Sequence, residues 1–147
     1  MRISIRFFYV LLIAFMLFGC SNQSKTKADL SNPKNTAIDQ TMAIEAKKKI
    51  ASYKETTVVH AVNTSKKLFV AFDIKHRNKL TFKQILEKRK KALKKQFPDK
   101  EIEVSTDQKL LMETEKIEKQ LKDDKIKSEK ALDKKMEALI KLSRKKT

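Results

Sequence analysis

The residue whose type and position most clearly suggest chemistry is Cys20, the only cysteine of this 147-residue chain. It directly follows Gly19, the only glycine, at the end of an uninterrupted apolar run from Phe7 to Phe18. A lone cysteine excludes an internal disulfide and a metal site built from several thiolates. Two roles remain: Cys20 is the attachment point of a covalent group, or it is a buried free thiol without a function.

The segment before Cys20 has the composition of an export signal. Arg2 and Arg6 hold that end of the chain on the cytoplasmic side of a membrane, and twelve apolar residues follow from Phe7 to Phe18. Twelve helical residues span about 18 Å, whereas a hydrocarbon core is about 30 Å thick. We therefore expect residues 1–19 to be a signal peptide rather than a membrane span, with an uncleaved anchor as the alternative.

The signal ends in four residues that resemble the bacterial lipobox, which consists of an aliphatic residue, a variable residue, glycine or alanine, and then cysteine. These residues are Leu17, Phe18, Gly19 and Cys20. The resemblance implies that Cys20 receives a diacylglyceryl group on its sulfur and becomes the N-terminus of the mature chain. Two or more acyl chains attach a protein stably to a membrane, whereas one chain alone would be marginal. The expected location is the extracytoplasmic face of the cell membrane.

No pattern in the rest of the sequence predicts a catalytic, cofactor or metal site. The chain beyond Gly19 contains no glycine, which excludes phosphate-binding loops, dinucleotide fingerprints and the nucleophile elbow. The two histidines, His60 and His76, lie in a strand-like run and in a polar loop, and a metal or hydrolytic role would need convergent partners. Asp107 is better explained as an acid near a helix N-terminus, where the helix dipole favours it. We therefore expect a protein that is not an enzyme and uses no cofactor.

The most conspicuous charged feature is the basic run KRKKALKK, from Lys88 to Lys95. The chain has a formal charge of +17, and Arg2 and Arg6 are its only charges before Cys20, which leaves +15 on the mature chain. Near an anionic membrane each lysine or arginine adds roughly 1 kcal/mol of binding free energy, and anionic wall polymers attract the same charges. The alternative is a solvated helix face without a partner. The residues expected to contact an anionic surface are Lys88, Arg89, Lys90, Lys91, Lys94 and Lys95.

Nucleic acid is not an expected partner, although a basic helix suits phosphate contacts. Every aromatic residue of the mature chain falls within the apolar pattern of a helix or strand, which predicts core residues rather than base-stacking platforms. These residues are Tyr53, Phe69, Phe72, Phe82 and Phe97.

Hydrophobic periodicity predicts the elements that must position these residues. Residues 21–36 are polar and contain Pro33, so we expect a flexible tether with a root-mean-square span of about 20 Å. The predicted elements are a helix at 38–53, strands at 56–62 and 67–74, a helix at 81–97, a strand at 101–105 and a helix at 106–121.

These elements predict an α+β fold in which helices pack on one face of a small three-stranded sheet, because that arrangement buries their apolar stripes economically. The order is α-β-β-α-β-α, followed by a charged helical tail with only a short apolar stripe. The predicted segments are a signal peptide at 1–19, the lipidated cysteine and tether at 20–36, an α/β domain at 37–121 and a basic helical tail at 122–147.

Several strings between residues 46 and 121 resemble the sporulation lipoproteins of the YhcN/YlaJ type, which occur in spore-forming bacteria. The strings are KKKIASY, TTVVHAV, LFVAFDI and EIEVSTDQKLL. The resemblance implies a lipid-anchored protein of a spore membrane, with a structural or accessory role in spore formation or germination. It carries over no functional residue besides the lipidated cysteine, because the biochemical activity of the family is poorly defined.

The sequence therefore predicts a bacterial lipoprotein that is anchored through Cys20 and held near anionic lipid or wall polymer by its basic surface. The alternative is an exported binding module that docks an unknown protein partner through its sheet edge or its C-terminal helix.

Overall fold

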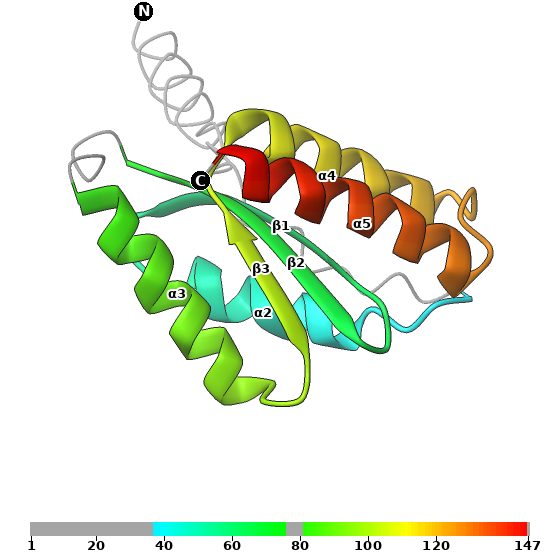
Figure 1. Ribbon diagram of the computed structural model, residues 1–147, viewed down its shortest axis with the longest axis horizontal. Coiled ribbons are helices and arrows are strands. Elements are labelled where there is room, and N and C mark those ends of the chain that lie inside the picture. The colour runs from blue at the N-terminus through cyan, green and yellow to red at the C-terminus, as the bar shows by residue number, and fades with distance from the viewer. Residues whose placement is uncertain (1–36, 76–80, 147) are drawn as a thin grey trace, which may run out of the picture.

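The computed structural model describes residues 37–75 and 81–146, and Figure 1 shows how their helices and strands are arranged. The middle layer is a three-stranded sheet. β1 (Thr56–Asn63) and β2 (Lys67–Ile74) form an antiparallel hairpin, and β3 (Glu101–Ser105) pairs parallel to β2. The strand order is β1-β2-β3, so β2 is central and the other two strands form the edges.

Helices cover both faces of this sheet (Figure 1). α2 (Thr41–Ala51) and α3 (Phe82–Gln96) pack on one face, whereas α4 (Gln108–Lys122) and α5 (Glu129–Lys146) pack on the other. The α+β class, the three-stranded sheet and the order of elements are confirmed. The expected placement of all helices on one face is corrected, because the second face carries a core of its own.

The central strand β2 explains why helices cover both faces of the sheet, because it has buried apolar side chains on both faces. Leu68, Val70 and Phe72 are fully buried in the core that faces α2 and α3, while Phe69 and Ala71 are fully buried in the core that faces α4 and α5. Successive side chains of a strand point to opposite faces, and the residues from Leu68 to Phe72 are all apolar, so this part of β2 must be covered on both faces.

The stretch 122–147, expected to be a separate charged tail, contributes to the second core. Leu132 and Met136 of α5 are fully buried, and Leu139 and Ile140 are each 5% exposed. The apolar stripe of α5 therefore packs on the sheet beside α4, and no boundary in the packing falls at residue 121.

A tight turn after α4 brings α5 back along it. Asp124 has a φ of 53°, and the N–H groups of Asp124 and Lys125 donate to the carbonyls of Leu121 and Gln120. This pair of bonds is the left-handed C-terminal cap that glycine usually occupies. The chain beyond Gly19 has no glycine, and Asp124 takes the left-handed position of this cap.

Candidate functional site

The described residues include one of the two predicted sites, the basic run on α3. Cys20 and the motif from Leu17 to Cys20 lie outside them, as do the rest of the predicted signal peptide and tether. His76 also lies outside the described residues.

The outer side of α3 presents five exposed lysines. The inner side of the helix is occupied by Leu93 and by the partly buried Ile85 and Leu86, so the exposed residues point away from the sheet. None of the five lysines forms an ion pair with another described residue, and Glu87 is the only acid of the helix. Such a cluster creates a positive potential that an anionic surface would lower. We call these residues the α3 basic face: Lys83, Lys88, Lys91, Lys94 and Lys95.

Arg89 was predicted to belong to this surface, and that prediction is wrong because its side chain turns inward. Arg89 is 7% exposed, its guanidinium carbon lies 3.2 Å from the centroid of the Tyr53 ring, and Nη2 is ion-paired with Glu55. Burial lowers the pKa of Arg89, while the contact with Tyr53 acts in the opposite direction. Arg89 thus stacks on an aromatic ring and pairs with a carboxylate, which ties α3 to the segment between α2 and β1.

Lys90 is also engaged in the fold rather than free for a partner. Its Nζ lies 3.1 Å from Oε2 of Glu103 on β3, and Oε1 of Glu103 accepts a hydrogen bond from Ser143 Oγ of α5 at 3.1 Å. Glu103 therefore joins one helix from each face around the edge strand β3. Four of the six predicted contact residues stay exposed without an ion pair to a described residue, and Lys83 is an additional one that the predicted set missed.

A second carboxylate acts in the same way at the opposite edge of the sheet. Glu118 of α4 accepts from Lys47 Nζ of α2 at 2.9 Å and from the Ala61 N–H at 3.0 Å, and its other oxygen lies 2.7 Å from Nδ1 of His60. Burial, the largest influence, raises the pKa of Glu118, but its contacts with His60, Lys47 and Ala61 outweigh burial, so this pKa lies below its ordinary value. His60, which the sequence predicts to be a core-edge or solvent-facing residue of a strand, is part of this junction of α2, β1 and α4.

The same edge is closed farther along by Gln40. Its Oε1 accepts from the Asn63 N–H at 3.1 Å, and its Nε2 donates to the Asn63 carbonyl at 2.7 Å. These are the two backbone bonds that a neighbouring strand would otherwise make. The Ala61 N–H and both backbone groups of Asn63 therefore have partners within the fold, which protects this part of β1 against pairing with another chain.

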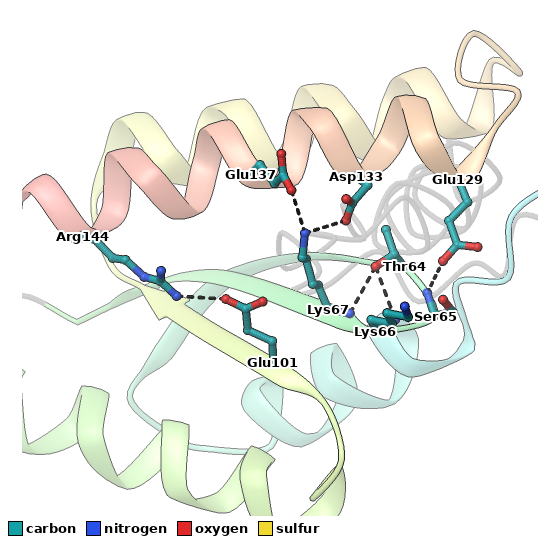
Figure 2. A network of polar contacts seen from close by, with 9 residues as sticks. All are labelled: Thr64, Ser65, Lys66, Lys67, Glu101, Glu129, Asp133, Glu137 and Arg144. Carbon is teal, nitrogen blue, oxygen red and sulfur yellow. Dashed lines mark hydrogen bonds and ion pairs between the residues drawn. The ribbon is translucent and has the colours of Figure 1, made fainter.

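Figure 2 shows how α5 is held against the hairpin by a row of acids. Glu129, Asp133 and Glu137 are spaced four residues apart along the helix. Glu129 accepts from the Ser65 N–H, and the other two form ion pairs with Lys67 Nζ at 2.9 Å and 3.1 Å. The hydrogen bonds that Lys67 Nζ donates to Asp133 and Glu137 raise the pKa of Lys67. The acids of α5 are thus used within the fold.

Four hollows in the described surface lie away from α3. One, beside Lys47 and Glu118, has a volume of about 20 Å³, which is room for about one water molecule. Three open grooves of about 390, 530 and 520 Å³ surround the hairpin and α5. No residue of α3 lines any of the four, so none of them opens on the α3 basic face.

Two further properties concern residues 37–75 and 81–146. Within these ranges, no group of three or more His, Cys, Asp or Glu side chains is placed to hold a metal ion. No helix in the same part of the chain is both long and apolar enough to cross a membrane.

Comparison with known proteins identifies one family. The family model described as Sporulation lipoprotein YhcN/YlaJ matches residues 19–136. The match begins at Gly19, immediately before Cys20, and ends within α5, so it includes the sheet, all of α2 to α4 and more than half of the stretch expected to be a tail. No curated protein and no solved structure gives a significant match. Because the match covers well over half of its length, the chain belongs to the YhcN/YlaJ family of sporulation lipoproteins.

Proposed function

We propose that this protein is anchored by lipid on Cys20 and has a structural or accessory role, not an enzymatic one, in spore formation or germination. The observation that carries the proposal is the start of the family match at Gly19, directly before the cysteine. A shared segment that begins at this point is expected if Cys20 is the mature N-terminus of a lipoprotein. The domain then lies on the extracytoplasmic face of the cell membrane or of a spore membrane.

Replacing Cys20 tests the anchor directly. In membrane fractions from sporulating cells, Cys20→Ala should release the protein or leave it as a precursor that retains residues 1–19, while Ser21→Ala should behave like the wild type. Unchanged extraction of Cys20→Ala with the membrane would instead indicate an ordinary hydrophobic anchor.

The α3 basic face supports a second part of the proposal, namely that charge holds the domain near anionic lipid or wall polymer. Lys88, Lys91, Lys94 and Lys95 are exposed and have no acidic partner among the described residues. The sixteen tether residues, 21–36, reach at most about 55 Å when extended, so the domain stays close to the surface that holds its anchor. Because the Debye length is about 8 Å at physiological salt, the attraction requires near contact.

The non-enzymatic role is supported by the positions of the buried charges. Lys47, Arg89, Glu103 and Glu118 each join a helix to the sheet or to another segment, and the hollow beside Lys47 and Glu118 admits about one water molecule. Incubation of the purified protein with cortex peptidoglycan, followed by an assay for released reducing ends, tests this role. Robust turnover would contradict it.

Docking of a protein partner, the alternative function, would use the exposed side of α5 or the outer edge of β3. The inner side of α5 is packed on the sheet, and the outer edge of β1 is engaged at Ala61 and Asn63. Salt separates the two functions, since electrostatic adsorption should fall steeply at high ionic strength whereas an apolar protein contact should persist.

A further inference from the structure

We infer that the domain docks on an anionic bilayer through one entire layer of the fold, formed by α2 and α3, with the α4–α5 layer facing away from the membrane. This inference rests on the proposed function. It adds the orientation of the domain and names the ligand as anionic lipid headgroups rather than a wall polymer.

The two helical layers differ in their charge balance. α2 and α3 carry ten basic and two acidic residues, whereas α4 and α5 carry eleven basic and six acidic residues. On α4, Glu113 pairs with Lys116 at 2.8 Å and Glu115 with Lys119 at 2.7 Å. By these counts α2 and α3 together have a net charge of +8 and α4 and α5 together a net charge of +5, while ion pairs within the fold give three basic residues of each layer local neutralisation.

Arg144, near the end of α5, gives a further example of this neutralisation. It pairs with Glu101 of β3 at 2.9 Å (Figure 2). A bilayer that approached the α4–α5 layer would meet acids as well as lysines, and those acids would be repelled by anionic headgroups.

The exposed lysines of α2 and α3 point in the same direction. Both helices pack on the same face of the sheet (Figure 1), and Gln96 Nε2 lies 3.3 Å from Oε2 of Glu45 across the pair. On α2, Lys48 and Lys49 are exposed on the side opposite to its buried stripe. Together with the α3 basic face they form a surface that we call the α2–α3 lysine layer: Lys48, Lys49, Lys83, Lys88, Lys91, Lys94 and Lys95.

The chemistry and shape of this layer favour lipid headgroups. Lysine is a compact point charge that attracts phosphate without a fixed geometry, which suits mobile headgroups. None of the four hollows opens on α3, so none of them would hold a linear polymer along its lysines. Val58 and Met112, the exposed large apolar residues of the described part, lie on β1 and α4, so contact through the lysine layer requires no insertion into the bilayer.

The position of the tether agrees with this orientation. α2 begins at Thr41, five residues after the predicted tether ends at residue 36, so the anchored segment leads directly into a helix of the lysine layer. The anchor supplies proximity, and the layer supplies the attraction that selects one orientation.

The orientation can be measured by energy transfer from a label on the protein to an acceptor on the lipid headgroups. In the mature lipoprotein Cys20 carries lipid, so one introduced cysteine is the only free thiol. Two positions are compared, Gln84→Cys on α3 and Met112→Cys on α4, both of which are exposed. The lipoprotein is reconstituted either in vesicles of phosphatidylglycerol and phosphatidylcholine in equal parts or in vesicles of phosphatidylcholine alone.

On the anionic vesicles at low salt we expect more transfer from the label at position 84 than from the label at position 112. The difference should vanish on neutral vesicles. It should also vanish in about 1 M salt, because the Debye length falls there to about 3 Å.

Two double variants with the same change in charge provide a matched comparison. Lys48→Gln with Lys49→Gln removes two charges from the lysine layer, and Lys134→Gln with Lys135→Gln removes two from α5; none of the four lysines is ion-paired with another described residue. One lysine near an anionic surface corresponds to roughly a fivefold change in a binding constant. The α2 pair should therefore lower the docking constant by about 10- to 25-fold and reduce the salt concentration at which the transfer is half lost. The α5 pair should change the constant by less than about twofold.

Equal transfer from the two labels on anionic vesicles, or equal effects of the two double variants, would overturn the inference. If a soluble poly(glycerol phosphate) binds through Lys48 and Lys49 while transfer from the two labels stays equal, the ligand is a wall polymer; the inference then fails and the proposed function stands. A free thiol on Cys20 would contradict the proposed function itself, and its labelling in the chain without an introduced cysteine reports that failure separately.

Discussion

Replacement of Glu118 by glutamine removes one negative charge from the junction of α2, β1 and α4 and keeps the shape of the side chain. In the wild-type protein this carboxylate lies 2.9 Å from Lys47 Nζ and accepts the Ala61 N–H at 3.0 Å. The side chains of Lys47 and Glu118 are only 6% and 11% exposed, so bulk water cannot solvate the Lys47 ammonium group in place of the lost carboxylate. We expect Glu118→Gln to destabilise the fold.

The size of the effect follows from the burial of the pair. Removal of one partner from a buried ion pair costs about 3–5 kcal/mol. The amide oxygen of glutamine still accepts one hydrogen bond, and the site lies at the edge of the sheet, so we expect a loss of about 2–3 kcal/mol in the free energy of unfolding. For a domain of this size that loss corresponds to a fall in Tm of about 8–12 °C.

Thermal unfolding at pH 7, followed by circular dichroism, measures this change. Lys47→Met and the double variant Lys47→Met with Glu118→Gln complete a cycle that isolates the pair. Glu115→Gln is the matched control on the same helix, because its partner Lys119 is 68% exposed and the pair is screened by water. The Tm of this control should stay close to that of the wild type.

The pH dependence of the same variant gives a second check. The pKa of Glu118 is lowered in the folded state, so its contribution to stability is fully present above about pH 4.3, the ordinary value for glutamate, and is lost as the pH falls through the folded-state pKa. The difference between wild type and Glu118→Gln should be full at pH 7 and shrink in acid. Equal Tm values at pH 7, or a difference that does not shrink below pH 4, would refute the role of the charge.

Four other substitutions, of which Lys91→Gln is a control, are expected to separate structural from surface residues. Asp124→Gly should raise the free energy of unfolding in urea by about 0.5–1 kcal/mol, because glycine adopts the positive φ of the α4 cap without a steric cost; a loss of stability would contradict this. Arg89→Gln should cost about 2 kcal/mol in the same assay, whereas Lys91→Gln should cost almost nothing, and equal effects would show that Arg89 is a surface residue after all. Asp107→Ala should cost about 1 kcal/mol, because the Asp107 side chain accepts the Leu110 N–H at 3.0 Å at the start of α4; an unchanged urea midpoint would refute that cap.

The helices and strands could be predicted from the sequence because each has its own hydrophobic periodicity. Whether helices cover one face of the sheet or both depends on the residues of β2. The strand KLFVAFDI has no polar residue from Leu68 to Phe72, which is typical of a strand covered on both faces. The same run is also compatible with one buried face, and a short strand does not distinguish the two. The apolar residues of α5, from Leu132 to Ile140, then cover the second face.

The basic surface could be predicted in outline but not residue by residue. A run of lysine and arginine does not show which side chain turns inward. The signal that could have identified Arg89 is its position four residues from both Ile85 and Leu93, on the apolar side of the helix. The junction of Lys47, His60 and Glu118 had no local signal, because those residues lie far apart along the chain and meet only where α2 and α4 enclose β1.

The most direct test of a lipid-anchored protein is the mass of the N-terminal peptide of the mature chain, isolated from membranes of sporulating cells. The predicted peptide begins at Cys20 and carries a diacylglyceryl group on its sulfur. A peptide that retains residues 1–19, or one that contains Cys20 with a free thiol, would contradict the anchor and the proposals that depend on it.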